Sequence, residues 1–297
     1  MSRTYSVTGI NLKSSIMGEN DRLLTILTPD RGLIKVAAPG ARKQNAKLGG
    51  RSGLFVINDM LIAQGKSLDR LTQAETLESF PALAKNLAKL TTAQYLVEIA
   101  LQQAIPNHPQ AELYYLLTEH IGRIEQAEGD QILPCLTHGT YQLLALAGLA
   151  PQVQQCCLSG RVMDDEQPQV GFSIEAGGVV DLFVLAERLA EAKAAGHFNP
   201  TRVALGLNLQ PPINARGRSR SPKKPLVTLG PVSLKVMQSL AEEQLPQVDP
   251  TRLKPEEILQ VWRGIEGLLR HYAQFHLERP IRSASLIETC FPTPVPN

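Results

Sequence analysis

Short apolar runs separated by turn residues occupy the first 80 positions of the chain, a pattern typical of β-strands. The runs at 23–28 and 33–38 flank Pro29-Asp30-Arg31-Gly32, where proline presets φ for a turn and glycine can take the positive φ that closes it. These two runs therefore predict a β-hairpin. Similar runs predict strands at 5–12, 54–62 and 67–78. Five short strands favour a barrel of the oligonucleotide-binding (OB) type at 1–80, with a long loop at 39–53.

After Pro81 the apolar positions recur every three or four residues, which predicts an α-helix of some twenty residues. The same spacing predicts helices at 109–127, 132–148, 182–195, 231–244 and 255–277. A Gly-rich stretch interrupts the helical pattern and contains β-like segments at 170–174 and 179–180. We therefore expect an α+β chain. Its expected parts are the barrel at 1–80, an all-helical domain at 81–150 and 182–290, and a small insert at 151–181.

The composition limits the class of protein. With 297 residues, of which 43% are hydrophobic, the chain can bury a sizeable core, so we expect a globular protein. The 30 Lys and Arg nearly balance the 28 Asp and Glu, so any affinity for nucleic acid must come from local patches. Four irregularly spaced cysteines are too few for a disulfide framework, and neither a signal peptide nor a membrane span stands out. These features predict a cytoplasmic protein.

One basic run falls largely in the expected 39–53 loop. From Arg31 to Arg51 the chain has six basic residues and no acidic one. A flexible basic loop beside a barrel face suits the neutralisation of phosphates, because each contact releases condensed counterions whatever the base sequence. The alternative is a solvated loop that its charge keeps soluble. The candidate DNA-binding residues of this run are Lys35, Arg42, Lys43, Lys47 and Arg51.

A second basic run lies in a segment rich in Pro, Arg and Ser at 208–226, which we expect to be a mobile loop. No Asp or Glu occurs between His197 and Ala241. The segment is either a DNA-binding arm or a linker with incidental charge. Its candidate DNA-binding residues are Arg216, Arg218, Arg220, Lys223 and Lys224. A weaker basic group near the C-terminus comprises Arg270, Arg279 and Arg282.

Motifs of catalysis are missing from the sequence. No Walker-type phosphate loop, His-Glu-x-x-His pair or Gly-x-Ser-x-Gly elbow occurs. The acidic run Asp164-Asp165-Glu166 resembles Mg²⁺ ligands, but adjacent carboxylates point in different directions, which favours a solvated loop. His271 and His276 lie about 140° apart around a predicted helix, so they cannot share a metal. We expect no catalytic residue, metal or cofactor.

Four short motifs occur in order along the chain: Gly18-Glu19-Asn20-Asp21, residues 28–32, Pro39-Gly40-Ala41-Arg42, and Arg279-Pro280-Ile281-Arg282-Ser283. In this order they resemble the RecO family of bacterial recombination mediators, from residue 5 to about 287. The resemblance implies an OB fold, a helical domain and a small insert that often binds zinc. It also implies a non-catalytic role in DNA repair and recombination. In that role the protein binds single- and double-stranded DNA, anneals complementary strands, and works with RecR to load RecA on DNA coated with the single-strand-binding protein SSB.

The zinc ligands that the resemblance implies are incomplete in this chain. Zinc-binding members have Cys-x-x-Cys-Gly and, after a Gly-Gly pair, a second Cys-x-x-Cys. Here Cys156 and Gly160 match the first motif, but Ser159 takes the place of its second cysteine. Asp181 and Val184 take the places of the second cysteine pair. Because a structural zinc site needs four ligands, we expect the insert to hold no metal.

The resemblance also implies an apolar pocket for the SSB tail in the helical domain, with basic residues for the tail's carboxylate. The candidates are Leu113, Tyr114, Leu117 and Arg123, although residues 138–140 lack the basic side chains that the family has there. A plain core helix is the alternative for these residues. For the whole chain, the alternatives to a recombination mediator are an OB-type RNA-binding module and a Mg²⁺-dependent nuclease.

Overall fold

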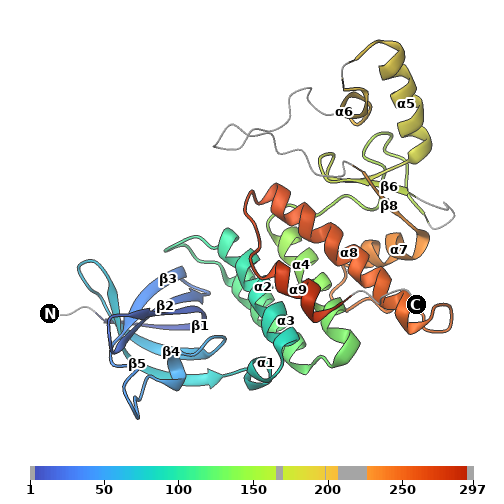
Figure 1. Cartoon of the computed structure of the whole chain (residues 1–297). Coiled ribbons are helices and arrows are strands. Elements are labelled where there is room, and N and C mark those ends of the chain that lie inside the picture. The colour runs from blue at the N-terminus through green and yellow to red at the C-terminus, as the bar shows by residue number, and fades with distance from the viewer. Residues whose placement is uncertain (1–3, 165–169, 198, 207–225, 293–297) are drawn as a thin grey trace. The chain divides into compact units, whose positions relative to one another are not determined.

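A computed structural model describes residues 4–164, 170–197, 199–206 and 226–292 (Figure 1). The chain forms two compact units, one of residues 1–139 with 282–297 and one of residues 140–281. The first unit contains the strands β1 (Thr4–Met17), β2 (Asp21–Thr28), β3 (Gly32–Ala38), β4 (Ile57–Ala63) and β5 (Asp69–Glu78). They close into a barrel in the order β1-β2-β3-β5-β4, with β3 and β5 parallel. The predicted five-stranded OB-type barrel is confirmed.

Two strand boundaries of the barrel differ from the prediction by three residues or more. β1 extends five residues further, to Met17, because Lys13–Met17 pair with β2 after a bulge near Asn11. β4 begins at Ile57 and not at Leu54, because Phe55 has a φ of +59° and its N–H donates to the carbonyl of Asn11 at 2.9 Å. Inward-facing side chains of all five strands fill the barrel, among them Val7, Leu24, Val36, Ile62 and Leu71.

The described residues of the first unit also form helices, most of which follow the barrel in the sequence. They are α1 (Pro81–Lys85), α2 (Leu87–Gln103), α3 (Ala111–Gln126), α4 (Ile132–Leu146), which ends in the second unit, and α9 (Ala284–Cys290). The predicted first helix is divided because the side chain of Asn86 accepts the N–H groups of Ala88 and Lys89 and so starts α2. The short helix α9 was not predicted. It packs on α2, where the Glu98 carboxylate accepts the N–H groups of Arg282 and Ser283 at 2.5 and 3.1 Å.

The turn between β2 and β3 is attached to the segment between α2 and α3. Leu33 donates its N–H to the carbonyl of Ile105 at 3.2 Å, and Gln110 donates its N–H to Pro29 at 2.8 Å. Gly32 has a φ of +59°, and a Cβ at this position would lie 2.3 Å from the carbonyl oxygen of His108. Only glycine fits this junction, which holds the hairpin against the helices.

The described residues of the second unit form a small sheet and four helices that lie wholly within the unit. The sheet has the order β7 (Gly178–Val180), β6 (Val170–Ser173), β8 (Val227–Leu229), so its third strand comes from outside the predicted insert. The helices are α5 (Leu182–Ala194), α6 (Pro200–Ala204), α7 (Pro231–Ser239) and α8 (Pro255–His276). α7 is shorter than predicted. Beyond the end of this helix, the side chain of Gln142 donates to the carbonyls of Leu240 and Glu242. Among the residues described, no helix combines the length and apolar character needed to cross a bilayer.

Candidate nucleic-acid interface

Two lysines share a row across the outer face of β1, β2 and β3. Lys13 is paired with Thr25, and Thr25 is paired with Lys35 on the next strand. Residues that pair directly point to the same face of a sheet. The neighbours of Thr25 along β2, Leu24 and Ile26, lie in the core, so the row faces outward, and both lysines are exposed.

Lys13 was missed by the sequence reasoning. It has no basic neighbour within several residues, so it belongs to no charge run. Strand alternation could not place it either, because the bulge makes Ile10, Asn11 and Leu12 all buried. Only the register with β2 shows that Lys13 lies two strands away from Lys35.

The 39–53 loop is folded into successive turns, and this differs from the flexible loop that we expected. Lys43 donates its N–H to Gly40, Ala46 to Lys43, and Gly49 to Ala46, at 3.0–3.1 Å. The loop also contributes to the core, where Ala41 is buried and Leu48 packs against the barrel cluster. Its apolar residues therefore fix its path while its charged side chains stay outside.

Two buried asparagines anchor the end of the loop. The amide of Asn11 donates to the carbonyls of Arg51 and Gly53 at 2.8 and 2.9 Å, and the amide of Asn58 donates to Arg51 at 2.9 Å. Both asparagine side chains are fully buried, and a buried amide is costly unless it is hydrogen-bonded. These contacts hold the 3-10 turn η1 (Gly50–Ser52) in place.

The start of the loop lies against the turn between β1 and β2. Arg42 donates its backbone N–H to Asn20 at 2.9 Å and its guanidinium to Gly18 and Glu19 at 3.2 and 2.9 Å. OB folds use this turn to bind oligonucleotides. The side chains of Arg42, Lys43 and Lys47 are exposed in this loop, which follows directly after β3, the strand that carries Lys35.

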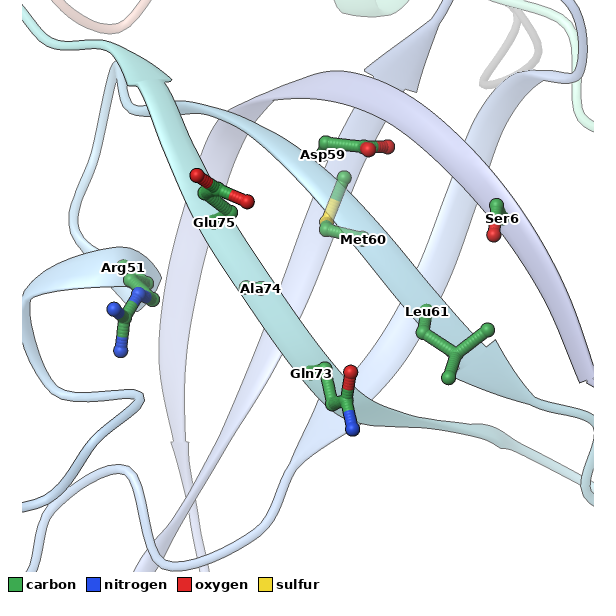
Figure 2. A pocket seen from close by; sticks show the side chains of 8 residues that line it. All are labelled: Ser6, Arg51, Asp59, Met60, Leu61, Gln73, Ala74 and Glu75. Atoms are coloured by element: carbon green, nitrogen blue, oxygen red, sulfur yellow. The ribbon is translucent and has the colours of Figure 1, made fainter.

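Arg51 has different surroundings from the other basic residues of the loop. It lines a pocket on the outer side of β4 and β5 together with Asp59 and Glu75 (Figure 2). The two carboxylates lie directly opposite each other on paired strands, and the Arg51 guanidinium donates to the carbonyl of Lys47. Carboxylates that line the same pocket as Arg51 repel a phosphate, so Arg51 is the weakest DNA-binding candidate of the loop.

The remaining basic candidates are the residues at 216–224 and the three arginines near the C-terminus. Arg216, Arg218, Arg220, Lys223 and Lys224 lie outside the described residues. Arg270 is half-buried, with its Nε 3.6 Å from a carboxylate oxygen of Glu266, whereas Arg279 and Arg282 are exposed.

The residues considered for catalysis do not converge. Asp164 is exposed, and Asp165 and Glu166 lie outside the described residues. A ring nitrogen of His271 lies 2.6 Å from the carbonyl of Gly267, and one of His276 lies 3.0 Å from that of Ile174. Within the described part of the chain, no three His, Cys, Asp or Glu residues are grouped so that they could hold a metal ion.

Comparisons with known proteins address the whole chain. Residues 1–80 match the family model "Recombination protein O N terminal", and residues 84–211 match "Recombination protein O C terminal". The chain is 46% identical to the DNA repair protein RecO of Nostoc punctiforme, over 98% of this chain and 97% of that protein. It is also 46% identical to the DNA repair protein RecO of Acaryochloris marina, over 100% of this chain and 98% of that protein. The chain belongs to the RecO family.

The zinc position implied by the RecO resemblance contains residues that do not fit the metal. Val184 has no ligand atom, and its N–H donates to the carboxylate of Asp181, which also accepts the N–H of Phe183 at 2.8 Å. The Cys156 sulfur accepts the N–H groups of Leu158 and Asp181 at 3.4 and 3.2 Å. The residues that would face a metal are therefore engaged otherwise: Cys156 accepts hydrogen bonds, and Asp181 caps the start of α5.

These hydrogen bonds change the acidity of the Cys156 thiol. Burial alone would raise its pKa, but the hydrogen bonds from Ser159, Asp181 and Leu158 outweigh burial and lower the pKa below its ordinary value. Ser159, at a position where the resemblance implied a zinc ligand, is thus a hydrogen-bond partner of the remaining cysteine.

The residues considered for the SSB tail lie on α3, where Leu113, Tyr114 and Leu117 are buried. This burial is what the alternative, a core helix, requires. Arg123 donates to Glu119 and to Nδ1 of His138, the latter at 3.2 Å. The arginine is therefore already engaged in a polar cluster.

Proposed function

We propose that this chain is a non-catalytic recombination mediator that binds single- and double-stranded DNA on the outer face of β1–β3. Membership of the RecO family supports a role in DNA repair and recombination. The observation that carries the proposed site is the row Lys13–Thr25–Lys35, and the loop that follows β3 adds the exposed Arg42, Lys43 and Lys47. Arg51 and the basic residues at 216–224 are secondary contacts in this proposal.

The site suits phosphates better than base edges. Lysine is a compact charge on a flexible stem, without the planar fork that reads guanine. Contacts of this kind release counterions and bind any sequence, as annealing of arbitrary complementary strands requires. In the proposed role the chain anneals strands, engages SSB, and works with RecR to load RecA on SSB-coated DNA. This work takes place in the cytoplasm, on the nucleoid.

Salt-dependent binding tests the proposed site. The double substitution Lys13→Ala/Lys35→Ala removes two phosphate contacts, so the log–log salt slope for single strands becomes shallower by up to about 1.4. The matched control is Lys193→Ala/Lys235→Ala, which removes two exposed lysines of the second unit. An unchanged slope in the first variant, or an equal change in both, would contradict the proposed face.

An annealing assay tests the proposed function. Wild-type protein should accelerate pairing of complementary strands coated with SSB, and the Lys13/Lys35 variant should be slower. Competition by RNA of the same sequence and incubation with labelled DNA and Mg²⁺ test the two other classes. Preferred binding of RNA would support the RNA-binding module instead of the mediator, and cleavage of the DNA would support the nuclease.

A further inference from the structure

Tyr5, near the start of β1, has a ring that is held in place. Its hydroxyl donates to Oδ2 of Asp69 at 2.7 Å, and Oδ1 of Asp69 accepts the N–H of Gly65 at 3.0 Å. The ring packs against the barrel core and is partly buried. Burial, together with the hydrogen bond to Asp69, raises the pKa of Tyr5, so the hydroxyl remains a donor. The orientation of the ring is therefore fixed from the β4–β5 loop.

The guanidinium of Arg31 lies over this ring, with its Cζ 4.2 Å from the ring centroid. The Arg31 backbone is held in the β2–β3 turn, because its N–H donates to Thr28 Oγ1 at 3.2 Å. The side chain is exposed, and its guanidinium forms no ion pair or hydrogen bond with any described residue. The ring is thus fixed, whereas the arginine that covers it can move.

Tyr5 is also the only aromatic side chain of the described barrel, residues 4–80, that solvent reaches. The other two aromatic residues, Phe55 and Phe80, are buried. A nucleobase that stacks on this barrel therefore has one ring available to it. Tyr5 and Lys13 are eight positions apart on β1, which corresponds to about 26 Å along the strand. A bound oligonucleotide of several nucleotides can span that length, since OB folds occupy about 4–16 nucleotides.

This inference rests on the DNA-binding function proposed above. We propose that Tyr5 and Arg31 form a stacking site for one unpaired nucleobase. The base takes the place of the guanidinium on the ring, and Arg31 turns to the phosphate of the same strand. The exchange is favourable because stacking of a base on an aromatic ring is stronger than an exposed cation–π contact. The arginine also gains a charge-assisted hydrogen bond to the phosphate.

The site would give the barrel a preference for single strands. In a duplex every base is paired and stacked, so none can reach Tyr5 without first leaving the helix. The lysine row binds the backbone of either form. Stacking on Tyr5 therefore adds affinity for single strands alone.

Substitution of the ring separates stacking from charge. Tyr5→Leu should weaken single-strand binding about 5- to 150-fold, the range expected for loss of one stacked base, with duplex affinity and the salt slope unchanged. Tyr5→Phe keeps the ring and should keep most of the affinity. Tyr115→Leu, at an exposed tyrosine of α3, is the matched control and should bind as wild type does. Circular dichroism and the melting temperature check folding.

A second measurement does not depend on the stability of Tyr5→Leu. In Tyr5→Trp, binding of oligo(dT) should quench the fluorescence of the added indole, whereas an abasic strand should not. The wild-type protein gives the background fluorescence of the buried Trp262. Wild type should also bind the abasic strand more weakly than oligo(dT). The proposal is overturned if folded Tyr5→Leu binds single strands like wild type, or if abasic and dT strands behave alike. Wild type that binds no DNA would overturn the DNA-binding function as well.

Discussion

The two sides of the barrel carry opposite charges. On β1–β3 the outward row contains Lys13 and Lys35, whereas a second outward row contains Asp59 of β4 and Glu75 of β5. Both rows lie on one small barrel, within a chain whose formal net charge is only +2. The comparison teaches that strand register, more than overall charge, decides which face of this barrel can receive a polyanion.

The basic side of the barrel depends on how the 39–53 loop is anchored. Substitution of the anchoring asparagines should therefore have the largest effect, a loss of unfolding free energy. Asn11→Leu leaves the Gly53 carbonyl without its donor and should cost about 1–3 kcal/mol of unfolding free energy. Asn58→Leu should cost a similar amount. The double variant should cost more than the sum, because either amide alone still binds the Arg51 carbonyl. Urea titrations measure all three, and strict additivity would argue against a shared anchor.

A buried histidine should make the stability of the first unit depend on pH. Burial, with His138 and Arg123 nearby, lowers the pKa of His120 from 6.5 to about 3. Between these pH values the unfolded chain binds a proton that the folded chain excludes, so stability falls as the pH is lowered. The slope should approach about 1.4 kcal/mol per pH unit.

Replacement of the histidine isolates this contribution. His120→Leu should flatten the loss of stability between pH 6.5 and 5, as followed by thermal melts. A profile that keeps the wild-type slope would show that other groups cause the loss. No histidine occurs among residues 4–80, so binding of DNA to the barrel should change little over the same range while the protein stays folded.

Within the loop, the contrast between the two sides predicts unequal contributions. Arg42→Ala/Lys43→Ala/Lys47→Ala should make the single-strand salt slope shallower by up to about 2.1. Arg51→Ala should change it by much less, because Arg51 lies beside Asp59 and Glu75. Equal changes per residue would mean that the acidic pocket does not limit access of DNA to Arg51.

The smallest expected effect concerns the acidic side. Asp59 and Glu75 are directly opposite on paired strands, and like charges in that position destabilise a sheet. Asp59→Asn/Glu75→Gln should therefore raise the unfolding free energy by about 0.2–1 kcal/mol. A decrease in the melting temperature would show instead that the carboxylates stabilise the barrel.

The sequence allowed much of the fold to be predicted, because turn residues and apolar periods marked the strands and long helices. It could not show the bulge near Asn11, which buries three consecutive residues and leaves Lys13 on the outer face. It could not show that Arg51 shares a pocket with Asp59 and Glu75, which are eight and 24 positions away. The short elements α9 and β8 depend on partners distant in sequence, so local patterns did not reveal them.

One charge reversal on each side of the barrel tests whether single-stranded DNA binds on β1–β3. Single-strand affinity is measured at several salt concentrations for Lys35→Glu and for Glu75→Lys, with circular dichroism as the folding control. Binding on β1–β3 predicts that Lys35→Glu weakens binding and makes the salt slope shallower by about 0.7 or more, while Glu75→Lys leaves the slope nearly unchanged. Binding on β1–β3 is contradicted if Glu75→Lys changes the slope as much as Lys35→Glu does, or if Lys35→Glu binds like wild type.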